Sequence, residues 1–266
     1  MNELELAKVL AVEAGAILLD AFHKSSPVRW KGLNSPVTDA DMSASSLLVG
    51  AIRKHFPEDG ILCEETTDDL NRLTKPRVWI IDPMDGTSEF VAHVGEFAVM
   101  IGLAIHGKPV LGVVYQPTEA TLLYGESGSG AFLEHPGQAT PQKLSAAKNT
   151  EDLVAAVSRS NDSTQYESVR QALGINRIVH SGSAGLKIGM ICQKRADLYV
   201  HTGPETNQWD TCAPEVILHE AGGRLTDMFN APLRYNVSEP RHLQGIVASN
   251  GVIHEQIIKA AQRSVR

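Results

Sequence analysis

A short apolar run that leads straight into an acidic turn is the feature of this sequence that most restricts its fold. Four apolar residues, Val78 to Ile81, form the pattern of a buried strand that ends where Asp82 begins. In a strand that continued, Asp82 and Asp85 would point to opposite faces, because side chains alternate along a strand. Pro83 stops the strand, and Gly86 allows a backbone path closed to other residues. We therefore expect the turn to bring both carboxylates to one point.

This turn has two possible uses. Gly86 precedes a short run that can be helical, with Thr87 placed as its cap, so that free backbone N–H groups would face an anion beside the carboxylates. Carboxylate oxygens next to an anion site favour Mg²⁺ over Zn²⁺. Asp, Pro and Gly are also ordinary residues of surface turns. On its own, the turn fits a metal site and a surface turn about equally well.

Further motifs stand elsewhere in the chain, in a fixed order with the acidic turn. They are Glu64-Glu65, then Asp82-Pro83-Met84-Asp85-Gly86-Thr87, then Trp209-Asp210-Thr211-Cys212-Ala213, then Glu220-Ala221-Gly222-Gly223. Together they resemble the lithium-sensitive, Mg²⁺-dependent phosphatases, a family that includes inositol monophosphatase and the 3'(2'),5'-bisphosphate nucleotidases. The resemblance spans nearly the whole chain. The segment around Gly203-Pro204 and Trp209 is closer to the nucleotidase branch.

The resemblance implies a phosphomonoesterase that uses in-line attack of water and two or three Mg²⁺ ions at one site. The implied metal ligands are Glu64, Asp82, the Met84 carbonyl, Asp85 and Asp210. The implied catalytic residues are Glu64, Asp41 and Thr87. Thr87, polarised by Asp41, would orient the water, and the Gly86 and Thr87 amides would hold phosphate oxygens.

Two of these acids also have ordinary structural interpretations. Asp41 stands in the first turn of the helix expected after Thr38, where an acid is favourable for the helix dipole. Asp210 follows Trp209 at the start of another expected helix, where it would serve as an N-cap. The resemblance, rather than the local pattern, assigns Asp41 to the nucleophilic water and Asp210 to the second ion.

Loops at the expected strand ends of the second half suit a second phosphate. Ser160, Ser183 and Lys187 offer hydroxyl donors and one positive charge there. The ordinary alternative is that Ser183 caps a helix and Lys187 is solvated on it. Inositol monophosphatases usually have a glutamate seven residues before the Trp-Asp aspartate, where this chain has Gly203. Glu205 is the nearest acid, and we expect it to bind substrate.

Hydrophobic periodicity divides the chain into two parts. The first opens with an expected helix over residues 2–24 and another from residue 38, and continues as alternating runs typical of an antiparallel meander. After a stretch rich in Pro, Gln, Ala and Lys, expected strands and helices alternate, which predicts an α/β arrangement. We therefore expect an α+β domain over residues 1–145 with most metal ligands, and an α/β domain over 146–266 with the substrate loops. The family resemblance implies an α-β-α-β-α layered sandwich.

Composition limits the partners and the location of the protein. The chain has 266 residues, 42% of them hydrophobic and 21% charged, and no apolar stretch approaches the ~20 residues that span a bilayer. A net charge of −7 argues against nucleic-acid polymers, which require a basic face. Glu3 and Glu5 give the N-terminus the reverse of a signal peptide's charge, so we expect a cytoplasmic protein. Its partner would be a small phosphate ester, and it would be a monomer or a homodimer.

The resemblance also ranks the possible functions. The expected substrate is 3'-phosphoadenosine 5'-phosphate, cleaved to AMP and phosphate in sulfur metabolism. An inositol monophosphatase, or a broader phosphatase for NADP or sugar phosphates, is the alternative within the same class. A non-catalytic relative that keeps the fold is the alternative from another class, and the complete acidic set argues against it.

Overall fold

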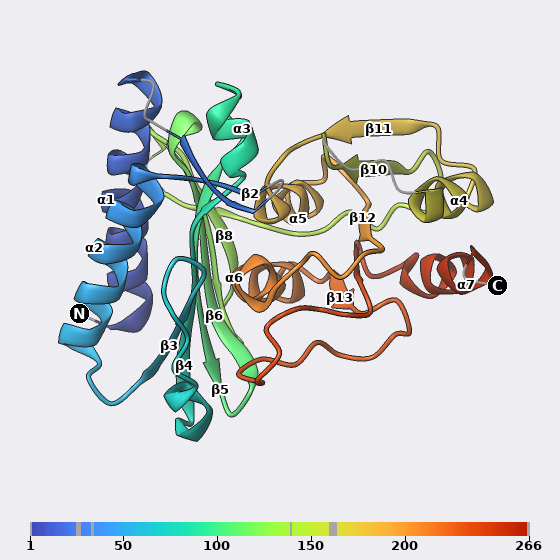
Figure 1. Cartoon of the computed structure of the whole chain (residues 1–266). Coiled ribbons are helices and arrows are strands. Elements are labelled where there is room, and N and C mark those ends of the chain that lie inside the picture. The colour runs from blue at the N-terminus through green and yellow to red at the C-terminus, as the bar shows by residue number, and fades with distance from the viewer. Residues whose placement is uncertain (1, 25–27, 33–34, 139, 160–163, 265–266) are drawn as a thin grey trace.

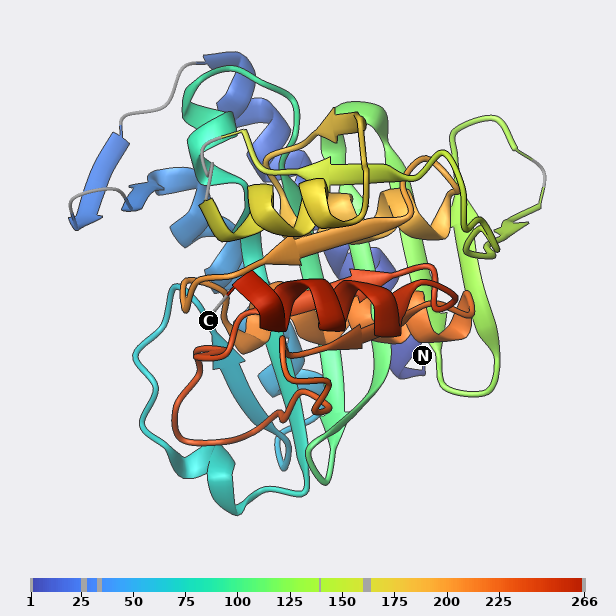
Figure 2. The same cartoon turned by 90° about the vertical axis from the view of Figure 1, so that its right-hand side faces the viewer.

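The computed structural model describes residues 2–24, 28–32, 35–138, 140–159 and 164–264, whose elements form five stacked layers (Figure 1). Helices α1 (Glu3–Lys24) and α2 (Asp39–His55) form one outer layer. A seven-stranded sheet follows, then helices α5 (Ala184–Cys192) and α6 (Gln208–Glu220), then a five-stranded sheet. Helices α4 (Thr164–Ala172) and α7 (His254–Ser264) cover the far side, which faces the viewer in Figure 2. This order confirms the predicted α-β-α-β-α sandwich.

The seven-stranded sheet has the strand order β3-β4-β5-β6-β7-β8-β9. Its strands are β3 (Gly60–Cys63), β4 (Arg77–Asp85), β5 (Ala98–Ile105), β6 (Lys108–Gln116), β7 (Thr121–Glu126), β8 (Gly130–Glu134) and β9 (Gln142–Lys143). Strand β3 runs parallel to β4, and each later pair is antiparallel. The predicted meander is therefore confirmed in β5 to β8. Strands β1 (Val28–Gly32) and β2 (Ser35–Thr38) form a separate antiparallel pair. The other short elements of this half are η1 (Asn71–Thr74), α3 (Thr87–Val91) and η2 (Pro117–Glu119).

The five-stranded sheet lies in the second half of the chain and has the order β11-β10-β12-β14-β13. Its strands are β10 (Val154–Val157), β11 (Arg177–His180), β12 (Leu198–His201), β13 (Arg224–Thr226) and β14 (Ile246–Ser249). Strand β10 is parallel to β11 and β12, whereas β14 is antiparallel to both of its neighbours. The predicted alternation of strands and helices is confirmed, with one more strand after α6 than the periodicity indicated.

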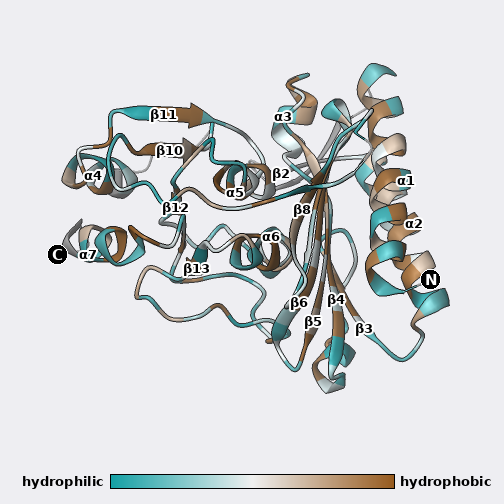
Figure 3. Cartoon of the chain, turned by 180° about the vertical axis from the view of Figure 1, so that it is seen from behind, coloured by the Kyte–Doolittle hydropathy of each residue, from teal (hydrophilic) through white to brown (hydrophobic). Residues whose placement is uncertain are grey.

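Three apolar cores fill the spaces between the layers, and Figure 3 shows the hydrophobic strands between them. Strand β4 contributes to two of these cores. Trp79 and Ile81 pack in the core with α1 and α2, whereas Val78 and Ile80 pack in the core with α5 and α6. This alternation follows from the pleat of a strand. A strand covered on both faces is apolar at successive positions, which explains its continuous hydrophobic run.

Helix α1 matches the predicted opening helix and is amphipathic. It has 22 residues, of which Leu6, Leu10, Ala14 and Leu18 recur at intervals of four and are buried. This spacing places them on one face of the helix, toward the seven-stranded sheet. Its exposed positions are mixed, with Glu5, Glu13 and Asp20 beside Val9 and Val12. Among the described residues, no helix combines the length and the apolar character needed to cross a bilayer.

A row of three glycines lets α6 lie close to the seven-stranded sheet. Gly102, Gly112 and Gly125 stand opposite one another on β5, β6 and β7. A Cβ atom on Gly112 would lie 2.0 Å from the carbonyl oxygen of Ala213 in α6. The helix backbone therefore rests directly on the sheet, where any side chain would push it away. This contact fixes the helix whose first turn carries Asp210.

The predicted boundary between residues 145 and 146 falls in the segment after β9. There the Ala146 N–H donates a hydrogen bond to the Ala221 carbonyl, 2.8 Å away, just after α6. One apolar core contains residues from both halves, because α5 and α6 lie between the two sheets. The division into two domains stays a prediction.

Replacing Gly112 by alanine is expected to lower the free energy of unfolding by about 1–3 kcal/mol, because the new methyl group has no space beside the α6 backbone. Urea titration of the variant and the native protein measures this difference. Gly50→Ala on α2 is the matched control, because a Cβ there meets nothing within 4 Å. Alanine favours a helix over glycine, so the control should be neutral or stabilising. Equal free energies for the two variants would contradict the close approach of α6.

Candidate active site

The sequence predicts that β4 ends where Asp82 begins. In the structure, β4 instead continues to Asp85 through a β-bulge. Asp82 lies opposite Met100 of β5 and Asp85 lies opposite Ala98, so three steps along β4 match two steps along β5. The additional residue restores the two acids to one side, because a bulge inserts one residue into one strand of a pair. Pro83 lies in this irregular stretch, where no ladder hydrogen bond is required of it.

Three aspartates from distant parts of the sequence meet beside the bulge. Asp82, Asp85 and Asp210 each present a carboxylate oxygen, and these oxygens all lie within 4.8 Å of one another. Asp210 stands in the first turn of α6, where its Oδ2 accepts a hydrogen bond from the Asn207 N–H at 2.6 Å. Asp82 Oδ1 accepts one from the Met84 N–H at 2.9 Å. Backbone donors thus orient two of the three carboxylates.

These aspartates line an open cavity of about 450 Å³. The other lining residues are Glu64, Met84, Gly86, Thr87, Glu205, Asn207 and Trp209. Glu64 follows β3, whose parallel pairing with β4 brings it beside the bulge, and its N–H donates to the Ile81 carbonyl at 3.2 Å. All five predicted metal ligands therefore line one cavity.

The acids of this cavity repel one another. Burial raises the pKa of Asp82 well above its usual value, and the nearby charges of Glu64, Asp85 and Asp210 raise it further. The pKa of Asp210 is raised for the same reasons. Such carboxylates need a proton or a cation between them. Because every atom that these side chains could offer to a metal is an oxygen, the arrangement fits a hard divalent cation such as Mg²⁺.

Ser183 holds Asp85 in place from the start of α5. Its hydroxyl donates a hydrogen bond to Asp85 Oδ2 at 2.5 Å, and the Gly185 N–H donates to the same oxygen at 2.9 Å. Ser183 Oγ also accepts from the Leu186 N–H at 3.0 Å, so it caps the helix. The side chain is completely buried. The hydroxyl is therefore bonded to Asp85 and to the start of α5, and the predicted contact of Ser183 with substrate stays a prediction.

Lys187 is buried, which contradicts the alternative that it is solvated on its helix. Its side chain is only 1% exposed, because α5 lies between the two sheets, and it is not among the residues that line the cavity. The ammonium group donates to the carbonyls of Ser181 and Gly182, at 3.2 and 2.6 Å. It also lies 4.9 Å from the centre of the Tyr199 ring. Lys187 is therefore not solvated, and its predicted contact with a phosphate stays a prediction.

Asp41 and Thr87 do not form the predicted pair. Asp41 Oδ2 accepts hydrogen bonds from the Thr38 N–H and hydroxyl, both at 2.7 Å, and completes a capping box at the start of α2. The Thr87 hydroxyl instead donates to the Met84 carbonyl at 3.1 Å. Each side chain has thus found a partner within three residues. Burial raises the pKa of the Asp41 carboxyl to about 6.

Gly86 is a position that requires glycine. Its φ of +100° lies in the left-handed region, and a Cβ atom would lie 2.6 Å from the Glu96 carbonyl oxygen. This conformation turns the chain from β4 into α3, with Thr87 as the first residue of the helix. The backbone at Gly86 and Thr87 therefore lies beside the carboxylates, as predicted from the turn.

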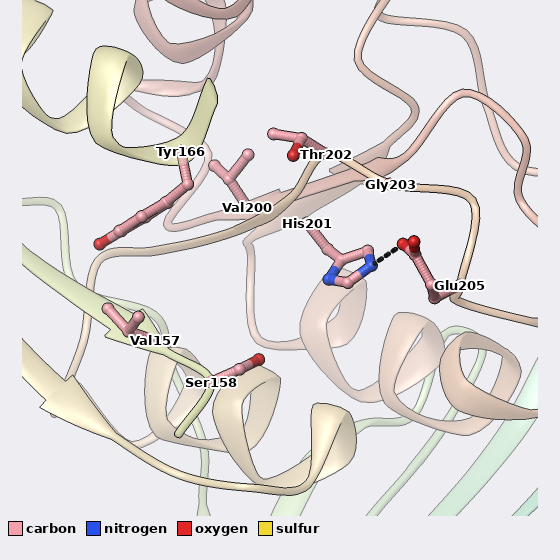
Figure 4. A pocket seen from close by; sticks show the side chains of 8 residues that line it. All are labelled: Val157, Ser158, Tyr166, Val200, His201, Thr202, Gly203 and Glu205. Carbon is pink, nitrogen blue, oxygen red and sulfur yellow. Dashed lines mark hydrogen bonds and ion pairs between the residues drawn. The ribbon is translucent and has the colours of Figure 1, made fainter. Parts of the chain in front are cut away.

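Glu205 lines both the acidic cavity and a smaller pocket beside it (Figure 4). Its Oε2 lies 2.9 Å from His201 Nε2, and the dashed line in Figure 4 marks this contact. The carboxylate also fills the space next to Gly203, where a Cβ atom would lie 1.8 Å from Oε2. An acid from two residues later thus stands where a side chain of residue 203 would project. Ser160, the remaining predicted contact, lies outside the described residues.

Two residues beside the site carry no prediction from the sequence. His201 contacts Glu205 from the end of β12, and no local pattern marks it, because the pair depends on how the following loop folds back. Asn207, in contrast, could have been identified from the sequence. It stands three residues before Asp210, which is the spacing of a capping box at a helix start.

The chain matches known sequences over almost its full length. The inositol monophosphatase family matches residues 2–266. The chain is 34% identical over 246 residues to the 3'(2'),5'-bisphosphate nucleotidase CysQ of Aggregatibacter actinomycetemcomitans, which covers 89% of this chain and 90% of that protein.

Solved structures extend the similarity to the fold. An inositol monophosphatase (IMPase) from Thermotoga maritima superimposes with a TM-score of 0.84 and 29% identity, covering 100% of this chain and 98% of that one. CysQ from Bacteroides thetaiotaomicron has a TM-score of 0.77 and 29% identity, covering 91% of this chain and 94% of that one. With its acidic cavity, its layered fold and these full-length matches, the chain belongs to the inositol monophosphatase family.

Proposed function

We propose that this phosphatase removes the 3'-phosphate from 3'-phosphoadenosine 5'-phosphate, giving AMP and phosphate, with Mg²⁺ held by the acids of the cavity. The observation that carries the proposal is the convergence of Asp82, Asp85 and Asp210 within 4.8 Å. Carboxylates this close are unfavourable unless positive charge separates them. The nucleotidase activity named for the relative at 34% identity supports this choice of substrate.

The lining residues fit a group of hard divalent cations. The proposed ligands are all oxygen donors: Glu64, Asp82, the Met84 carbonyl, Asp85 and Asp210. Oxygen donors favour Mg²⁺ over Zn²⁺, and four carboxylates balance the formal charge of two dications. When bound, such ions supply Lewis-acid stabilisation of the attacking and leaving oxygens.

The chain itself would position the phosphate and the water. We assign the Gly86 and Thr87 N–H groups, which lie beside the acids at the start of α3, to the phosphate oxygens. The Thr87 hydroxyl donates its proton to the Met84 carbonyl, so its oxygen can accept a hydrogen bond from the attacking water. Asp41 would contribute indirectly, because it fixes the start of α2 rather than polarising Thr87.

One observation favours an inositol monophosphatase as the second candidate. The Glu205 carboxylate occupies the space beside Gly203 and lines the acidic cavity. A carboxylate there could accept hydrogen bonds from the hydroxyl groups of a cyclitol as well as from a ribose. The nucleotide remains the first candidate because a relative at 34% identity is named as a 3'(2'),5'-bisphosphate nucleotidase, and the pocket in Figure 4 shares Glu205 with the acidic cavity.

The substrate preference can be measured directly. We expect kcat/KM to be about tenfold or more higher for 3'-phosphoadenosine 5'-phosphate than for inositol 1-phosphate, because a larger substrate gains contacts that discriminate between transition states. A phosphate-release assay with both compounds and with NADP, each with and without a chelator, provides the measurement. The reverse ranking would favour the inositol candidate, and activity that survives the chelator would remove the metal from the proposal.

Asp82→Asn should abolish most of the activity. The amide keeps the shape of the side chain but loses the charge that would hold a cation, and we expect a loss of at least about 100-fold in kcat. Asp20→Asn is the matched control, because Asp20 is exposed on α1 and paired with Lys24. Full Mg²⁺-dependent turnover by the Asp82 variant would disprove the assigned chemistry.

Ser183→Ala tests the support of Asp85. Loss of the hydroxyl that donates to Asp85 should weaken activity or metal affinity by about 10–100-fold, as expected when a metal ligand loses its supporting hydrogen bond. Ser181→Ala provides the control in the same turn, since Ser181 is equally buried and its hydroxyl has no hydrogen-bond partner among the described residues. Similar losses in the two variants would show that the turn, rather than the hydrogen bond to Asp85, is what matters.

A further inference from the structure

The long connection between β13 and β14 pairs with the chain that enters α6. It covers residues 227–245, shown in orange-red in Figure 2, and contains no helix or strand. Asn207 and Arg241 form an antiparallel bridge. Two backbone hydrogen bonds flank this bridge, from the His242 N–H to the Thr206 carbonyl at 2.7 Å and from the Gln208 N–H to the Pro240 carbonyl at 2.8 Å. Part of the connection, the 235–242 segment, thus acts as a strand partner for the residues just before Asp210.

This pairing determines the direction of the Asn207 N–H. Along a paired strand, the backbone groups of successive residues point alternately to the two sides. The Thr206 carbonyl and the Gln208 N–H both point to the 235–242 segment. The Asn207 N–H between them therefore points away from it, and there it donates to Asp210 Oδ2 at 2.6 Å. The bridge directs the donor that orients one proposed metal ligand.

Gln208 joins the 235–242 segment to the start of α6 through its side chain. This side chain is buried and is not among the residues that line the acidic cavity. Its Oε1 accepts a hydrogen bond from the Asn236 N–H at 2.7 Å. Its Nε2 donates to the carbonyls of Val237 and Glu239, at 3.3 and 3.2 Å. A buried amide that bonds only to the backbone of one loop fixes the path of that loop, because breaking these bonds leaves polar groups unpaired.

Arg72 of η1 holds the same segment from the other side. Its buried guanidinium donates to Asn236 Oδ1 at 3.1 Å and to the Val237 carbonyl at 3.0 Å. Asp68 balances its charge at 2.7 Å. In return, Asn236 Nδ2 donates to the carbonyls of Arg72 and Lys75, at 3.1 and 3.2 Å. The segment is thereby tied to the chain just before β4, the strand that carries the other two aspartates of the cluster.

We propose that the 235–242 segment is a positioning element of the active site and that Gln208 is the positioning residue through which it fixes Asp210. Without the Gln208 amide, the segment loses its hold on the start of α6 and the bridge at Asn207 loosens. The Asp210 carboxylate then lacks a fixed donor, and a cation in the cavity is held less tightly. This inference rests on the proposed metal site.

Gln208→Met tests this role, because methionine has a similar length and lacks the amide. Isothermal titration of the purified full-length protein is expected to show Mg²⁺ binding about tenfold more weakly to the variant, as when a ligand loses its supporting contacts. The Mg²⁺ concentration that gives half-maximal phosphate release should rise by the same factor. At saturating Mg²⁺, kcat should stay within about threefold of the native value, since the bound cation itself holds the carboxylate.

Asn250→Ala is the control for loss of stability alone. Asn250 is also a buried amide that holds a loop, since its Nδ2 donates to the Asn149 carbonyl at 2.9 Å and to Asp197 Oδ1 at 3.1 Å. It lies at the opposite end of β12 from His201. We expect this variant to unfold at a lower urea concentration than the native protein and to bind Mg²⁺ as the native protein does.

Asn236→Gly is a milder second variant, which decides the question if Gln208→Met does not fold. Asn236 has a φ of +53°, which glycine adopts without strain, so the change removes the contacts with Arg72 and keeps the turn. We expect Mg²⁺ to bind about threefold more weakly. Native Mg²⁺ affinity in the folded variants of the segment and of Gln208, or an equal loss in Asn250→Ala, would overturn this inference alone. A native protein that binds no Mg²⁺ would refute the metal site on which it rests.

Discussion

Repulsion between carboxylates in a cavity partly shielded from water is the constraint on which the rest of this structure depends. Each aspartate of the cluster accepts a hydrogen bond from an uncharged donor. The donors are the Met84 N–H for Asp82, the Asn207 N–H for Asp210, and the Ser183 hydroxyl for Asp85. These donors come from three separate elements. The fold therefore fixes the positions of acids that still need a proton or a cation between them.

The layered architecture explains how these donors come together. The two sheets are separated by α5 and α6, and the first turns of these helices supply Ser183 and Asp210 to the end of β4. Helix α6 approaches the sheet closely, because the row of glycines on the sheet has no side chains that would hold the helix backbone away. A cavity built in this way depends on packing between elements that are distant in the sequence.

Much of the fold could be predicted from the sequence, because its signals are local. The amphipathic spacing of α1, the turns of the meander and the alternation after β9 each reflect the periodicity of one element. The acids of the cluster were predicted from the family resemblance, because the local pattern of Asp82 and Asp85 fits a surface turn equally well and that of Asp210 fits an N-cap. The backbone path between the two acids was not predicted. Pro83 indicated the end of a strand, whereas in the structure the strand continues past Pro83 through a bulge.

The surroundings of the cluster could not be predicted, for physical reasons. A serine at a helix start with a lysine four residues later looks the same on a surface helix as on one buried between two sheets, so the position of Lys187 depended on the stacking of layers. Asp41 had competing roles, and its local hydrogen bonds with Thr38 prevailed. Glu205 reaches its place beside Gly203 through the path of a loop, which no periodicity describes.

At the bulge, the side chain and the backbone of Met84 have separate roles. The Met84 side chain is buried in the core beneath α1 and α2, while the residue lines the cavity and its carbonyl accepts the hydroxyl of Thr87. The ladder between β4 and β5 skips this residue, so its oxygen is not consumed by strand pairing. A main-chain oxygen survives any exchange of side chain, so another apolar residue at position 84 would fill the same place in the core and leave the oxygen at the cavity unchanged.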